Sequence, residues 1–143
     1  MLCMKKLLLI IIFNSLFFAG YSQSNYKIVI EPLLKTDTSY AGQKLVYPSG
    51  DSTETTIAKV ILPPGASTDW HMHDYPLYGY LIQGELTVER KGYPPFLMKA
   101  GSAYAEVIGT WHNGTNTGKV DCVFIVFSTG VRNHPLSVKR AGF

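Results

Sequence analysis

Three of the four histidines have a spacing that favours metal binding. His71 and His73 are two positions apart in a segment with the pattern of a strand. Alternate residues of a strand point to the same face, with Cα atoms about 6.6 Å apart, so the two imidazoles can converge on one ion. His112 follows Gly109-Thr110-Trp111, where a barrel can fold a later strand or loop beside the first pair. Because a lone His-x-His also occurs by chance, the elements around these residues decide its meaning.

Those elements are predicted to be short strands. Of the 13 Gly, all but one follow residue 22, as do all eight Pro, and no segment shows helical periodicity. Turn residues recur about every 8 to 12 residues, which indicates an all-β sandwich or barrel. Residues 113–118 are predicted to be a turn. The expected strands are 26–30, 43–47, 53–62, 67–72, 77–82, 85–91, 96–99, 103–108 and 120–128.

Residues 1–22 are predicted to be a cleaved signal peptide, which leaves one domain at 23–143. A short basic start precedes an apolar run, and Gly20 and Ser22 supply small residues before a cleavage at Gln23. A membrane anchor is the alternative, but the apolar run is about a dozen residues, and a span needs roughly 20. We therefore expect a secreted or periplasmic protein without a membrane segment after cleavage.

Charge and cysteine content exclude some functions for this domain. Cleavage would remove Lys5 and Lys6 and no acidic residue, so the net charge falls from +3 to +1. No basic run remains that would mark a nucleic-acid partner. Cys122 would be the only cysteine left, so no intramolecular disulfide can form. It lies in an apolar run and is expected to be a buried thiol.

The spacing of glycines around the histidines resembles the two motifs of the cupin superfamily. Gly65, five residues, His71-Met72-His73 and Gly84 match the first motif, and the second motif matches at a set of positions after Gly101. That set is Gly109, His112 and Asn116. The resemblance implies a single cupin barrel (a double-stranded β-helix, or jelly roll) that holds one divalent transition metal, Fe, Zn, Cu, Ni or Mn, through three His and one Glu.

Two positions depart from these motifs. Leu77 stands where the first motif has Glu, and Val107 stands where the second has Pro. Glu106 is the candidate replacement ligand, and we favour it over a solvent-facing residue because an inward acid on so apolar a strand needs a cation. A degenerate cupin that has lost the metal is the alternative, but all three histidines are retained.

Pocket residues are expected near the ligands. Alternation from Leu77 places Leu77, Gly79 and Leu81 on one face of a strand. The cupin resemblance implies that this face is the barrel interior, where Gly79 is predicted to leave room beside the metal. Aromatic residues close to the ligands in sequence are candidates for a substrate-binding mouth. They are Trp70, Tyr75, Tyr104 and Trp111.

The sequence favours a metal-dependent enzyme acting on a small molecule, of the dioxygenase or isomerase type found among cupins. Two alternatives remain, a module that binds a small ligand without turnover and a structural barrel. We also expect a homodimer. His134, beside Pro135 in the C-terminal tail, is predicted to be dispensable.

Overall fold

The computed structural model describes residues 27–50 and 52–139, so the predicted signal peptide lies outside the described residues. The chain divides into two compact units, residues 1–30 and 31–143. Of the first unit, residues 27–30 are described, and they have no regular secondary structure. The second unit contains all of the strands in the described ranges.

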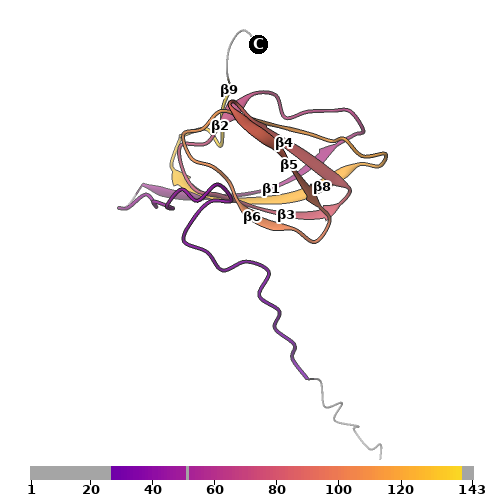
Figure 1. Cartoon of the computed structure of the whole chain (residues 1–143). Helices are drawn as coiled ribbons and strands as arrows, with labels where there is room; N and C mark the ends of the chain where they lie inside the picture. Colours follow the sequence, from indigo (N-terminus) through magenta and orange to yellow (C-terminus); the bar gives the residue numbers. More distant parts are fainter. Residues whose placement is uncertain (1–26, 51, 140–143) are drawn as a thin grey trace, which may run out of the picture. The chain divides into compact units, whose positions relative to one another are not determined.

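Within the described residues, strands form two sheets and no helix is long and apolar enough to cross a membrane. One sheet has the order β1-β8-β3-β6 and the other β5-β4-β7-β2-β9. Figure 1 shows them as two layers. The strands are β1 (Thr53–Leu62), β2 (His71–Met72), β3 (Leu77–Gln83), β4 (Glu85–Arg90), β5 (Tyr93–Lys99), β6 (Ala103–Ala105), β7 (His112–Thr115), β8 (Cys122–Val131) and β9 (Val138–Lys139).

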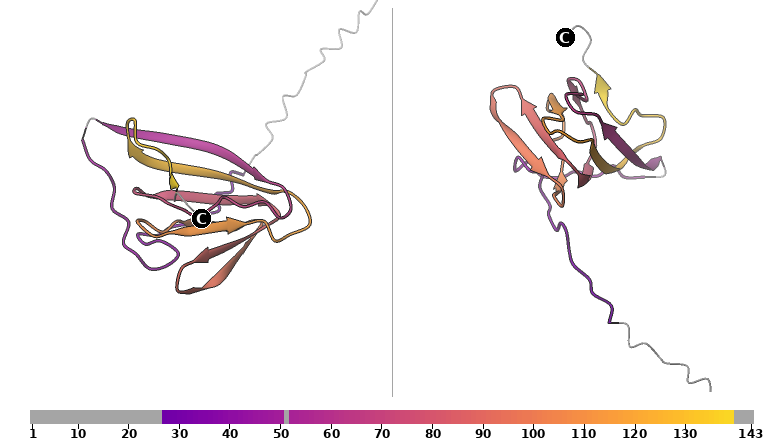
Figure 2. Two further views of the ribbon diagram at one scale, coloured as in Figure 1. Left: turned by 90° about the horizontal axis from the view of Figure 1, so that it is seen from above. Right: turned by 90° about the vertical axis from the view of Figure 1, so that its right-hand side faces the viewer.

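Strict alternation of apolar side chains explains the four-stranded sheet. β1 and β8 pair antiparallel over their full length, from Thr53 opposite Val131 to Leu62 opposite Cys122 (Figure 2). Every second residue of β8 from Cys122 to Ser128 is buried, as expected when one face of a strand packs on a core. On β3 the predicted inward residues Leu77, Gly79 and Leu81 are buried, whereas the residues between them are more exposed. This part of the prediction is confirmed.

The core lies between the two sheets, because both contribute buried side chains to a single cluster. Cys122 is among them and is a buried free thiol, as expected. The members are Leu77, Leu81, Leu86, Val88, Met98, Tyr104, Cys122, Phe124 and Val126. An all-β barrel is therefore confirmed.

Several predicted elements are wrong. Residues 27–30 and 43–47 form no strand, although Lys44 makes an isolated bridge to Thr38. The predicted turn at 113–118 begins instead as strand β7, in which His112 pairs with Arg90 and Thr115 with Thr87. Gly114 serves packing there, because a Cβ at this position would lie 3.2 Å from a methyl group of Leu86.

Candidate metal centre

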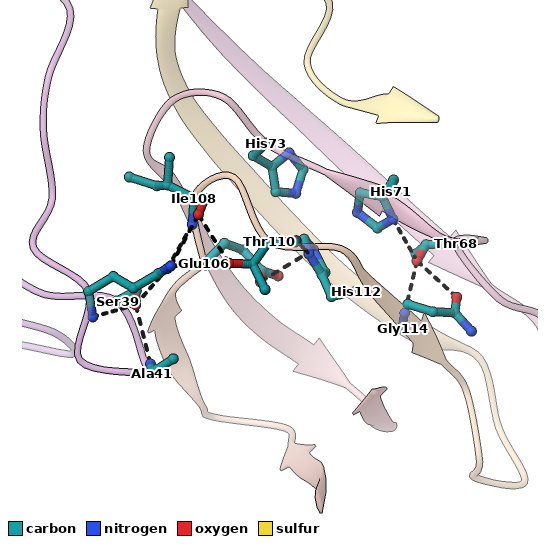
Figure 3. Close-up of polar contacts among 12 residues, drawn as sticks. Ser39, Ala41, Thr68, His71, His73, Glu106, Ile108, Thr110, His112 and Gly114 are labelled. Carbon is teal, nitrogen blue, oxygen red and sulfur yellow. Dashed lines mark hydrogen bonds and ion pairs between the residues drawn. The ribbon is translucent and has the colours of Figure 1, made fainter. Parts of the chain in front are cut away.

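The three histidines predicted from sequence are brought together by the five-stranded sheet. His71 on β2 is paired directly with His112 on β7, and His73 follows β2 at an isolated bridge to Ile108. One ligand atom from each lies within 4.8 Å of the others. Bonds of about 2.1 Å place opposite ligands of an ion about 4.2 Å apart, so one ion can reach all three after small ring rotations. Figure 3 shows the three rings facing one another.

Backbone carbonyls orient all three rings. The Nδ1 atoms of His71, His73 and His112 lie 2.7 to 2.8 Å from the carbonyl oxygens of Asp69, Leu136 and Thr110, respectively. A carbonyl only accepts hydrogen bonds, so each Nδ1 carries the proton and each Nε2 presents its lone pair. Hydrogen bonds of this kind fix the tautomer and direction of metal-binding histidines.

Two of these carbonyls come from matching local turns. His71 and His112 each bond to the residue two positions earlier, and in both cases a tryptophan lies between, as Asp69-Trp70-His71 and Thr110-Trp111-His112. Asp69 has φ 58°, a conformation uncommon outside glycine. Such strain is often retained at functional sites. A tryptophan directly before the histidine is common to both turns, and this repeated pair is a sequence signal that was not considered when only the motif spacing was compared.

The loop before His112 is fixed by a residue that the sequence did not single out. The Gln43 side-chain amide donates to the Ile108 carbonyl and the Thr110 hydroxyl, and its oxygen accepts from the Ile108 N–H at 3.0 Å. Gln43 therefore holds the turn whose Thr110 carbonyl orients His112.

Burial keeps the histidines neutral. It lowers the pKa of His73 to about 4 and that of His112 to about 3, and it also lowers the pKa of His71. All three remain buried within the barrel, with 8% or less of each residue exposed. Neutral imidazoles are the form that binds a metal, so the site is prepared for a cation at neutral pH.

Glu106 directs its carboxylate into the same site. Its Oε2 atom lies 3.7 Å from Nε2 of His112. Both atoms are buried, and neither has a hydrogen-bond partner among the described residues. Burial raises the pKa of the Glu106 carboxyl to about 7. Two buried polar atoms that face each other at a distance too long for a hydrogen bond fit a cation ligated by both.

The position of Glu106 also accounts for the missing acid of the first motif. Glu106 directly follows β6 and lies beside Leu77 of β3, because the Glu106 N–H donates to the Leu77 carbonyl at 2.8 Å. Both side chains line one cavity together with the three histidines. The Glu106 carboxyl group therefore lies at the same cavity as the position at which the first motif has its acid.

The family follows from a sequence comparison. A model of the Cupin domain family matches residues 58–128, a region that contains all three histidines and Glu106. The chain belongs to the cupin superfamily. No curated protein sequence matches this cupin.

Solved structures share its fold. A cupin-like protein from Thermotoga maritima is 24% identical, with a TM-score of 0.55 over 60% of this chain and 64% of its own. Oxalate decarboxylase from Lactobacillus farciminis is 20% identical, with a TM-score of 0.51 over 59% of this chain and 26% of its own. The DMSP lyase DddQ from Ruegeria pomeroyi is 22% identical, with a TM-score of 0.52 over 66% of this chain and 47% of its own. Each match spans less than two thirds of the other chain.

The cupin site opens into a cavity of about 150 Å³. Its polar groups gather around the histidines, and most of the remaining wall is aliphatic, with Phe124 as the aromatic member. The lining residues are Val60, Thr68, His71, His73, Leu77, Leu86, Val88, Glu106, His112, Gly114, Phe124, Val126, Leu136, Ser137 and Lys139. A cavity of this size, with a mostly apolar wall and a few polar groups, is typical of sites for small molecules.

The lining differs from the pocket predicted from sequence. Trp70, Tyr75, Gly79, Tyr104 and Trp111 are not among the residues that line this cavity. Tyr104 is instead a core residue, and Tyr75 lines two other surface hollows. Substrate contact by these five residues stays a prediction.

Gly79 does not leave open space beside the metal site. A Cβ on Gly79 would lie 2.1 Å from Cζ of the Tyr104 ring, which pairs with Gly79 across the sheet. The missing side chain therefore makes room for Tyr104. Sequence periodicity correctly placed Gly79 inward but could not show which neighbour fills the gap.

Proposed function

We propose that this protein is an exported, metal-dependent cupin enzyme that acts on a small molecule, with chemistry of the dioxygenase or isomerase type. His71, His73 and His112 hold one divalent transition metal, and Glu106 is the fourth ligand. The observation that carries the proposal is the convergence of three neutral, carbonyl-oriented imidazoles and the unpartnered Oε2 atom of the Glu106 carboxylate on one cavity.

Each group has a distinct task in this proposal. The bound ion would supply Lewis acid or redox chemistry. The histidines hold it without adding charge, whereas an ionised Glu106 lowers the net charge of the site by one. The aliphatic wall keeps bulk water away, and the cavity beside the ligands gives a substrate access. Two of the solved structures with this fold are named as a decarboxylase and a lyase, so the fold is compatible with turnover of small molecules.

Export and dimerisation complete the proposal. The basic start, apolar run and small residues before Gln23 support secretion or delivery to the periplasm. A homodimer is supported by an exposed apolar face on the outer side of the four-stranded sheet. Ile57 is 67% exposed, and its paired neighbour Phe127 is 39% exposed. A second copy presents the same nearly uncharged face, as a two-fold interface requires.

Metal analysis of the exported protein tests the central claim. We expect one transition-metal ion per chain, and we expect His71→Ala, His73→Ala and His112→Ala each to lose most of the affinity. His134→Ala is the matched control, since His134 lies outside the cluster and pairs with Asp74 at 3.3 Å. Stoichiometric metal in all three cluster variants would show that the site is elsewhere.

A further inference from the structure

The C-terminal segment Leu136–Lys139 forms part of the metal cavity although it lies outside the region matched by the family model. Leu136, Ser137 and Lys139 line the cavity, and the match ends at residue 128. In β9, Lys139 pairs with His71 and Val138 with Met72. This segment therefore adds cavity-lining residues from outside the matched region.

Two contacts fix the segment in place. The Leu136 carbonyl accepts a hydrogen bond from Nδ1 of His73 at 2.8 Å. The Lys139 ammonium donates to the Thr68 carbonyl, and an ammonium has two further N–H groups to offer. Among the described residues that line the cavity, Lys139 is the only Lys or Arg. A single positive side chain thus stands at the rim of a chamber that is otherwise mostly aliphatic.

We propose that Lys139 is a specificity-determining residue that selects a small carboxylate with an apolar body. This inference rests on the proposed function, because it places the carboxylate between the bound metal and Lys139. The apolar body lies among the aliphatic residues that line the cavity, including Val60, Leu86 and Val126.

Charge and volume define this class of ligand. A dication held by neutral imidazoles stays positive even when Glu106 is ionised, and Lys139 adds a further positive charge near the opening. An anion is attracted by both, whereas a neutral amide of the same shape is attracted far less. Cavities of about 150 Å³ in other proteins hold a molecule the size of benzene, and the cavity here has that volume. About six non-hydrogen atoms therefore suit it.

Butyrate and butyramide are matched probes, since they share size and shape and differ in charge. The full mature chain is first titrated with Co²⁺, whose visible absorption reports metal binding. The loaded protein is then titrated with each probe, and the ratio of the two dissociation constants is compared between variants. The variants are Lys139→Met, Lys139→Arg and, as a control with the same loss of charge on the exposed outer side of β1, Lys59→Met.

We expect the wild type to bind butyrate at least tenfold more tightly than butyramide. Lys139→Met should lower that preference about tenfold, which corresponds to about 1.4 kcal/mol, with its Co²⁺ affinity almost unchanged. Lys139→Arg and Lys59→Met should retain the preference.

The titrations separate two kinds of failure. Wild-type protein that binds no Co²⁺ would overturn the proposed function and this inference with it. Protein that binds Co²⁺ but binds neither probe, or binds both equally, would overturn this inference alone. An undiminished preference for butyrate in Lys139→Met would do the same.

Discussion

Glu106 makes the metal site testable by counting protons. Burial raises its pKa to about 7 and lowers the pKa of His73 to about 4 and of His112 to about 3. At pH 6 a carboxyl group with a pKa of 7 carries about 0.9 proton, whereas an imidazole with a pKa of 4 carries about 0.01. A ligand must lose its proton to bind a metal. Metal binding at pH 6 should therefore release about 0.9 proton from Glu106, and His71, whose pKa is also lowered by burial, should release less than a histidine of ordinary pKa.

Alternative ligand sets give different proton counts. Three histidines with the ordinary pKa of 6.5 would together release about 2.3 protons at pH 6. Three histidines with strongly lowered pKa values and no carboxylate would release almost none. The affinity changes in parallel: between pH 7.5 and pH 5, competition by one proton with a pKa of 7 weakens binding about 80-fold. Without Glu106 as a ligand, this pH dependence should nearly disappear.

Calorimetric titration with Zn²⁺ measures the release directly when it is repeated in buffers of different ionisation enthalpy. We expect about 0.9 proton at pH 6 and about 0.1 at pH 8 for the wild type, and close to none at either pH for Glu106→Gln. Glu89→Gln, which alters an exposed carboxylate on β4, should match the wild type. Zinc binding without proton release by the wild type at pH 6 would refute Glu106 as a ligand. Release of more than two protons would refute the lowered histidine pKa values.

Three further predictions concern the same cavity and its walls. Leu77→Glu should restore metal affinity in a Glu106→Gln background and add little to the wild type, because the two residues are hydrogen-bonded neighbours at one cavity. A Zn²⁺ titration of the double variant that shows no recovery of affinity would contradict this. The metal-free protein should lose stability as pH falls from 6.5 towards 4. His73 has a lowered pKa and so binds fewer protons in the folded state than in the unfolded state. The loss can reach about 1.4 kcal/mol per pH unit for each histidine. The raised pKa of Glu106 has the opposite effect on stability, because its stabilising contribution is present at low pH and is lost as pH rises through 7. Glu106→Gln should therefore make the loss of stability at acid pH steeper, as measured by urea denaturation. Gly79→Ala should cost about 2 kcal/mol or more through overpacking against Tyr104, and a thermal melt should show a smaller cost in a Tyr104→Leu background.

The sequence predicted those features that depend on local spacing. The alternation of β3 placed Leu77, Gly79 and Leu81 inward, and the structure confirms this. His71, His73 and His112 were found from two short motifs, and the structure brings them together. In both cases the signal lies within a few neighbouring residues, where strand geometry alone determines direction.

Features that depend on distant segments were missed. Residues 113–115 contain turn-forming types, yet they form β7 because β4 offers a partner strand and Leu86 needs a small neighbour at Gly114. Leu136 is far from His73 in the chain, and its carbonyl has no side-chain signature. Glu106 was favoured as an inward residue because its neighbours are apolar, but its place beside Leu77 depends on a hydrogen bond between distant segments.

If Glu106 is the fourth ligand, its place beside Leu77 shows how a metal site can exchange an acidic residue without changing its backbone. One hydrogen-bonded step across the sheet joins two positions that the chain itself separates widely. During divergence, an acid can arise at the position of Glu106 while the position of Leu77 still carries one. The original acid can then be lost, and the site has a carboxylate at every stage. Surveys that look for cupin ligands at fixed places along the chain would classify such a barrel as incomplete. A survey by position in space finds a buried carboxylate in the cavity.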